Sequence, residues 1–189
     1  MRLFIGIELD EQVRDTAAAI AESLRIQLGR GIDARWIPAA NLHITLWFIG
    51  EVADDRVEAL LRAIDRPFEE ASFDIEVAGL GAFPKSGAPR VIWIGVPSGA
   101  EQLVRLHAEL AARLRPFGIE PERRGYSAHL TIARVKDVAG GDRDGHLRAA
   151  FRATPAVAGP SRVAAVTVFR SRLSPKGAAY EPLLRVPLQ

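Results

Sequence analysis

Two histidines of the chain are each followed, two positions later, by a threonine. His43 and Thr45 lie in one apolar, strand-like run, and His129 and Thr131 lie in another. Because alternate side chains of a β-strand share a face, each histidine and its threonine are predicted to point the same way. If the two strands face one another, two imidazoles and two hydroxyls converge on a space suited to a phosphoryl group. The hydroxyls can donate hydrogen bonds to its oxygens, and the imidazoles can act as acid and base near neutral pH.

A single His-x-Thr motif is a weak signal, but here the motif recurs inside a duplicated frame. One copy runs from an aromatic-Ile-Gly-aliphatic segment at residues 4–7 through a helix to His43. The other runs from a similar segment at residues 93–96 through a helix to His129. The sequence therefore predicts an α+β fold of two lobes related by a pseudo-twofold, with two mainly antiparallel sheets and flanking helices around a central cleft. Because no linker interrupts it, the chain is predicted to be a single domain over residues 1–189.

Apolar periodicity places the remaining elements. Helices are predicted from Asp10 to about Gly31, from a capping box at Ser98 and Glu101 to about Pro116, over Asp54 to Ile64, and over roughly Asp144 to Phe151. Strands are predicted over Phe73 to Val77 and Val163 to Phe169, and loops over Phe83 to Pro89, Asp137 to Asp144 and Thr154 to Pro160.

Other chemistries lack their residues. The chain has no cysteine, and neither histidine strand carries a His-x-x-x-His, a His-Glu pair or an aspartate cluster, so no metal is expected. A phosphate-binding Gly-x-x-x-x-Gly-Lys loop and a Gly-x-Ser-x-Gly elbow are also absent. The other two histidines, His107 and His146, are predicted to be solvated surface residues. From the residues alone, either His43 or His129 could be the acid.

Composition limits the partners. The formal charge is +2, which argues against strong non-specific nucleic-acid binding but leaves room for a locally basic cleft. Nearly all basic residues are arginine, which suits phosphate recognition. Codon bias toward arginine and alanine is the favoured explanation of this composition. No apolar run approaches the roughly 20 residues that cross a bilayer. Acidic residues occur too close to the first residue to leave room for the apolar core of a signal peptide. We therefore expect a cytoplasmic protein that does not bind membranes.

With these motifs the sequence resembles the 2H phosphoesterase superfamily, and within it the RNA 2′,3′-cyclic phosphodiesterases, also called 2′-5′ RNA ligases. The resemblance extends over nearly the whole chain. Besides the segments around His43 and His129, it is carried by Arg2-Leu3-Phe4-Ile5, Arg35-Trp36, Phe48-Ile49-Gly50-Glu51-Val52, Arg90-Val91-Ile92-Trp93, Ser174, Gly177 and Tyr180. One departure is Ala128, where the family usually has proline before the second histidine.

The resemblance implies a bilobal α+β fold with a water-filled cleft and neither metal nor cofactor. It implies that His43 donates a proton and His129 accepts one, while Thr45 and Thr131 hold phosphate oxygens. The substrates it implies are RNA ends bearing a 2′,3′-cyclic phosphate, or small nucleotides, opened to a 2′-phosphate. No obligate protein partner is expected. Two alternatives stay open, namely 2′-5′ ligation as the main activity and non-catalytic binding of RNA ends.

The resemblance and strand alternation also indicate substrate-binding residues. Arg124 and Arg134 match positions commonly basic in the family, and Tyr126 matches one commonly aromatic. Arg134 is out of phase with His129, so its role requires a bulge or the end of the strand. Trp47 is in phase with His43 and is predicted to stack on a base, whereas the out-of-phase Phe48 is predicted to lie in the core.

Overall fold

A computed structural model of the chain describes residues 1–85, 87–121, 125–138, 143–174 and 177–189. The elements of the first half are β1 (Arg2–Glu8), α1 (Glu11–Leu28), β2 (Ile32–Trp36), β3 (His43–Glu51), α2 (Asp54–Ile64), β4 (Phe73–Ala78) and β5 (Leu80–Phe83). Those of the second half are β6 (Val91–Gly95), α3 (Ala100–Leu114), β7 (His129–Val138), α4 (Arg143–Ala153), β8 (Val157–Val163), β9 (Ala165–Ser174) and β10 (Gly177–Pro187).

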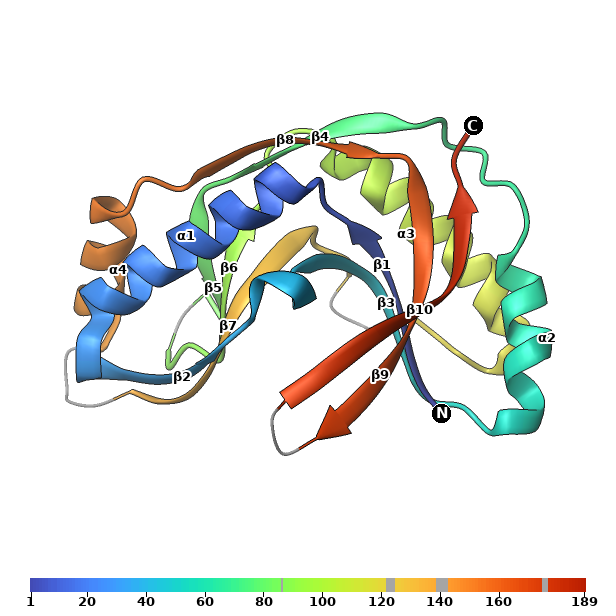
Figure 1. Ribbon diagram of the computed structural model, residues 1–189, viewed down its shortest axis with the longest axis horizontal. Coiled ribbons are helices and arrows are strands. Elements are labelled where there is room, and N and C mark those ends of the chain that lie inside the picture. Colours follow the sequence, from blue (N-terminus) through green and yellow to red (C-terminus); the bar gives the residue numbers. More distant parts are fainter. Residues whose placement is uncertain (86, 122–124, 139–142, 175–176) are drawn as a thin grey trace.

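An eight-stranded antiparallel sheet forms the frame of the molecule. Its strand order is β10-β9-β1-β3-β7-β6-β5, with β2 paired to β7, and β4 and β8 form a separate two-stranded sheet. Figure 1 shows an arch, with β4 and β8 across its top and the β9–β10 hairpin projecting beneath. The lobe of β1, β9 and β10 meets the lobe of β5 and β6 at the central strands β3 and β7. The predicted α+β fold with two lobes and two sheets is confirmed.

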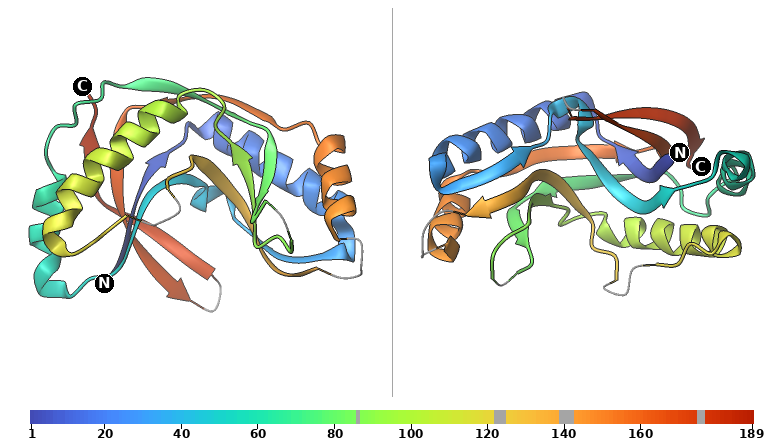
Figure 2. Two further views of the ribbon diagram at one scale, coloured as in Figure 1. Left: turned by 180° about the vertical axis from the view of Figure 1, so that it is seen from behind. Right: turned by 90° about the horizontal axis from the view of Figure 1, so that it is seen from below.

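Each long helix packs on the lobe opposite to the strand that precedes it. Helix α1 follows β1 but lies against β7, β8 and α4, whereas α3 follows β6 but lies against β3 and α2. Both views in Figure 2 and the view in Figure 1 show α1 with α4 at one end of the arch and α3 with α2 at the other. This exchange ties the lobes together, and one cluster of buried apolar side chains extends through both.

Strand pairing corrects the alignment of the two copies. Gly6 of β1 lies opposite Thr45, and the residue of β6 opposite Thr131 is Trp93. The structural counterpart of Gly6 is therefore Trp93 and not Gly95, a shift of two positions. Because two positions along a strand keep a side chain on the same face, the shift leaves the duplication intact.

The predicted helices form, with two wrong boundaries. Helix α2 has its predicted bounds, but α1 ends at Leu28 and not at Gly31, because Gly29 has a φ of +52° and residues 29–31 form a 3-10 turn. The capping box at Ser98 is wrong, because α3 begins at Ala100 after a left-handed Gly99, and Ser98 pairs instead with Glu76 of β4. None of the described helices combines the length and the apolar composition needed to span a membrane.

The C-terminal prediction is wrong at one strand. The expected strand from Val163 to Phe169 is divided at Ala164, because β8 ends in one sheet and β9 begins in the other. Strand β8 also occupies part of the expected loop over Thr154 to Pro160. Its only described partner is β4, so Pro160, which cannot donate to a ladder, lies on an edge strand where proline is tolerated. The loop expected over Asp137 to Asp144 falls largely outside the described residues, apart from the end of β7 and the start of α4.

Candidate active site

The two His-x-Thr motifs meet where β3 pairs with β7. The partners there are Ile44 and Leu130, the middle residues of the motifs, and both are completely buried. In an antiparallel pair this register sets His43 opposite Thr131 and Thr45 opposite His129. All four side chains leave the face of the sheet opposite to the buried pair, and the diagonal between two such positions is about 7–8 Å. The predicted convergence of the motifs is therefore a direct result of strand register.

Backbone carbonyls hold both imidazoles in the same way. The Nδ1 atom of His43 lies 2.8 Å from the carbonyl oxygen of Asn41, and that of His129 lies 2.8 Å from the carbonyl oxygen of Ser127. Since a carbonyl only accepts, Nδ1 carries the proton in each ring and the Nε2 of the neutral ring is a free base. The hydroxyl of Thr45 lies 3.0 Å from the Nε2 of His43 and can donate to it.

The electrostatics of the site disfavour imidazolium. Burial lowers the pKa of His43, the hydrogen bond to Asn41 raises it, and the charges of Arg134 and His129 lower it further. Burial likewise lowers the pKa of His129, the bond to Ser127 opposes this, and Arg134 adds to the lowering. The charge of Arg134 therefore acts on both imidazoles.

Each motif strand has a β-bulge directly after its threonine, and the bulge in β7 brings Arg134 to this face. The residue left without a partner at that place is Leu46 in β3 and Ile132 in β7, and in each strand this residue and the one after it are both buried before the next exposed one. The alternation therefore reverses after each bulge. Arg134 is the exposed residue in β7, so the bulge that its predicted role requires is present.

The same kind of bulge, in β3, reverses the predictions for Trp47 and Phe48. Phe48, expected in the core, is 56% exposed and lines a cavity beside the motifs. Trp47 is only 5% exposed and stacks on His107, with ring centroids 4.6 Å apart. It still borders the cavity, but the ring presented to solvent is that of Phe48.

The cavity has a volume of about 390 Å³ and extends from Thr45 and His129 toward α3. Tyr126 and His107 line it, stacked at 4.7 Å, so the expectation that His107 is a solvated surface residue is wrong. A signal was available, since Leu103, His107 and Leu110 share the spacing of the apolar helix face. The hydroxyl of Tyr126 is buried without a hydrogen-bond partner among the described residues, and burial raises its pKa.

Aromatic side chains that the sequence reasoning did not assign surround the two imidazoles differently. His43 lies 4.7 Å from Phe4 and 5.2 Å from Tyr180, measured between ring centroids. His129 lies 5.1 Å from Phe83 and 6.3 Å from Trp93. These differences make the two halves of the site chemically distinct, although their backbones are related by the pseudo-twofold.

Glycines create the space for two of these rings. A Cβ on Gly6 would lie 2.9 Å from the carbonyl oxygen of Ile44 and 3.2 Å from the imidazole of His43. A Cβ on Gly81 would lie 2.2 Å from the ring of Trp93. Both positions therefore require glycine for close packing beside the motifs.

His146 is exposed on α4, as expected. Arg124 lies outside the described residues. In the described part of the chain, no group of three or more histidine, aspartate or glutamate side chains is arranged to hold a metal ion.

The duplicated fold and the paired motifs define a class of protein that comparison with known families identifies. Residues 7–93 and residues 94–180 each match the family described as LigT like Phosphoesterase. The chain therefore belongs to the LigT-like phosphoesterases, and it is a hydrolase of phosphodiester bonds.

Individual relatives extend over most of the chain. It is 32% identical to a protein of Methanothermobacter thermautotrophicus named RNA 2′,3′-cyclic phosphodiesterase, over 95% of each chain. A protein of the same name from Thermotoga maritima is 36% identical over 72% of this chain and 71% of its own length. A crystal structure of a Thermus thermophilus protein superposes with a TM-score of 0.77 at 29% identity, covering 99% of this chain and 97% of that one.

Proposed function

We propose that this enzyme hydrolyses 2′,3′-cyclic phosphates at RNA ends to 2′-phosphomonoesters, using two histidines and no metal. The observation that carries the proposal is the register at Ile44 and Leu130, which gathers both His-x-Thr motifs on one face. Relatives named RNA 2′,3′-cyclic phosphodiesterase at up to 41% identity support the substrate class.

The proposed reaction is one in-line displacement at phosphorus. The neutral Nε2 of His129 takes a proton from water as the new P–O bond forms, and the protonated Nε2 of His43 gives a proton to the departing 3′ oxygen. The product carries a 2′-phosphate and a free 3′-hydroxyl. The attacking and leaving oxygens lie on opposite sides of phosphorus, which suits an acid and a base placed diagonally across a strand pair.

The remaining polar groups stabilise the charge that the phosphoryl oxygens carry. Thr45 and Thr131 donate hydrogen bonds to the non-bridging oxygens. Arg134, whose field already reaches both imidazoles, offers a guanidinium to the same oxygens. Anionic substrate in turn favours imidazolium, so binding offsets the lowered pKa values and prepares one ring as the acid.

The cavity gives the ribose its orientation. His129 and Thr45 line it, together with Phe48, Tyr126 and Trp47. We propose that the terminal nucleoside binds there, where the exposed ring of Phe48 can stack on the base. The Tyr126 hydroxyl, which has no hydrogen-bond partner among the described residues, can bond to the nucleoside. Because the cavity borders the two motifs unequally, it directs one ribose oxygen toward each histidine.

The decisive experiment combines an activity assay in EDTA with phosphorus NMR of the product. Wild-type enzyme should open a nucleoside 2′,3′-cyclic phosphate with excess chelator and yield only the 2′-phosphate. His43→Ala and His129→Ala should each lower kcat by about 10²–10⁴-fold, and the double variant should lose little more because the two act in one step. Thr45→Ala and Thr131→Ala should cost less, and the exposed His146→Ala is the matched control.

Each contrary result overturns a different part of the proposal. Activity that EDTA removes and a divalent ion restores would refute metal independence. A pure 3′-phosphate would exchange the roles of the two histidines, and a mixture of isomers would mean that the cavity does not orient the ribose. Full activity in either histidine variant would refute the mechanism.

A further inference from the structure

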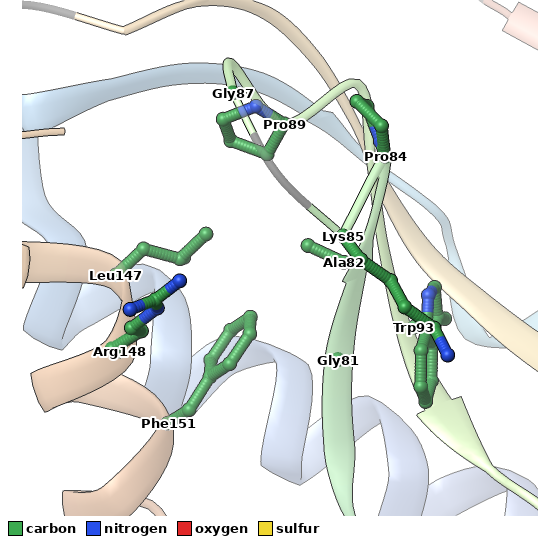
Figure 3. A pocket seen from close by; sticks show the side chains of 10 residues that line it. All are labelled: Gly81, Ala82, Pro84, Lys85, Gly87, Pro89, Trp93, Leu147, Arg148 and Phe151. Atoms are coloured by element: carbon green, nitrogen blue, oxygen red, sulfur yellow. The ribbon is translucent and has the colours of Figure 1, made fainter. Parts of the chain in front are cut away.

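A second cavity lies in the lobe of β5 and β6, between their connecting loop and α4. Its volume is about 270 Å³. Figure 3 shows Leu147, Arg148 and Phe151 of α4 facing the β5–β6 hairpin across an open space, with Lys85 and Trp93 on the hairpin side. No motif residue lines this cavity, so it is distinct from the site described above.

The residues that line the cavity have the chemistry of a single-stranded nucleic-acid site. Its charged side chains, Lys85 and Arg148, are both cations and both exposed, and no carboxylate lies among the described residues that line it. Phe151 and Trp93 add aromatic rings. Cations for the backbone combined with rings for the bases are the usual means of binding single strands. The small volume, below the roughly 300–1,000 Å³ of ordinary ligand pockets, suits one part of a longer ligand.

This cavity adjoins the one beside the motifs. Pro84 lines both cavities. Trp93 borders the second cavity and lies 5.2 Å from Phe83, which borders the first. It also lies 6.3 Å from the ring of His129. A strand held at the motifs therefore has cationic surface directly beside it, on the far side of Pro84.

We propose that the second cavity binds the nucleotide that precedes the cyclic phosphate end in an RNA strand. This proposal rests on the proposed function, because a 2′,3′-cyclic phosphate terminates the strand and the rest of the RNA must leave the first cavity through the 5′ oxygen of the last nucleoside. Lys85, next to Pro84, binds the phosphodiester that joins the last two nucleotides. Arg148 and Phe151 receive the preceding nucleotide, so the enzyme prefers an oligonucleotide end to a mononucleotide.

The test compares adenosine 2′,3′-cyclic phosphate with the dinucleotide ApA that ends in a 2′,3′-cyclic phosphate. Wild-type kcat/KM should be about tenfold or more higher for the dinucleotide, as expected for one added base and phosphate contact. The Lys85→Ala/Arg148→Ala double variant should lose that preference and retain wild-type kcat/KM for the mononucleotide. Its dinucleotide kcat/KM should also fall less steeply with salt, because fewer phosphate contacts remain.

A matched control is Arg66→Ala, which removes one exposed cation in the other lobe and should leave the preference unchanged. Two results would overturn the second site alone: equal wild-type kcat/KM for both substrates, or a double variant that keeps the wild-type preference. A wild-type enzyme that hydrolyses neither substrate would refute the proposed function, and the second site with it.

Discussion

Arg113 of α3 is predicted to contribute strongly to the stability of the protein, although arginine is usually a surface residue. Its side chain is only 5% exposed. The guanidinium donates to the carbonyl oxygens of Ile64 at 2.6 Å, Arg66 at 2.8 Å and Pro67 at 2.7 Å, and it also pairs with Glu109. These bonds hold α3 to the C-terminal end of α2 and the residues that follow it.

The cost of removing this group follows from what remains behind. The Arg113→Met substitution keeps most of the apolar stem but removes every hydrogen bond that the guanidinium gives to the three carbonyls and to Glu109. Among the described residues, the carbonyl of Ile64 then keeps only its bond from the Arg66 N–H, and the carboxylate of Glu109 keeps only its bond from the Glu69 N–H. The substitution also removes the guanidinium that lies 3.9 Å from the centre of the Phe68 ring. Removing one partner of a buried ion pair costs about 3–5 kcal/mol. In a domain of this size that free energy lowers Tm by about 6–20 °C.

Thermal and urea unfolding, followed by circular dichroism, measure the loss. The matched control is Arg105→Met on the same helix, because Arg105 also makes two bonds to a glutamate, Glu70, at 2.6 and 3.0 Å. That arginine is 56% exposed, so solvent replaces its bonds and Tm should stay close to the wild-type value. Equal Tm shifts for the two variants would refute the reasoning, since burial would then not decide the cost.

Three further predictions concern the site. Arg134→Gln should raise the pKa of both His43 and His129, because the guanidinium of the wild-type enzyme disfavours imidazolium. An acid and a base acting together give a bell-shaped dependence of kcat/KM on pH, and this profile should move to higher pH in the variant. A profile at the wild-type position, or histidine NMR titrations unchanged from wild type, would contradict this. Phe48→Ala should change the free energy of unfolding by less than about 1 kcal/mol, as expected at an exposed position, and should raise KM for nucleotides. A large loss of stability would instead show that Phe48 packs in the core. Tyr126→Phe should leave the free energy of unfolding, measured in urea, within about 1 kcal/mol of wild type, because the removed hydroxyl is buried without a hydrogen-bond partner among the described residues. The same variant should raise KM for nucleotides. A clear loss of stability would mean that the hydroxyl makes a structural hydrogen bond.

The sequence alone predicts much of the molecule because the relevant signals are local. The spacing of apolar residues predicts helix α2 at its observed bounds. The two His-x-Thr motifs predict which side chains share a strand face, because the period of a strand is two residues. Their duplication predicts a two-lobed fold, and the structure confirms it.

Only the tertiary structure decides what depends on pairing between distant segments. The bulge at Leu46 exchanges the predicted places of Trp47 and Phe48, and the bulge at Ile132 brings Arg134 to the site. A bulge is a feature of two strands in register, so one strand read by itself continues its alternation.

The burial of the two arginines of α3 also depends on the tertiary structure. Arg105 and Arg113 each follow a glutamate by four positions, Glu101 and Glu109, so their local sequence contexts are alike. Yet Arg113 is buried against α2, whereas Arg105 stays exposed and pairs with Glu70. The contribution of an ion pair to stability depends on how far the charges are removed from water. This burial is decided by the elements that pack against the pair, and those elements can be distant in the sequence.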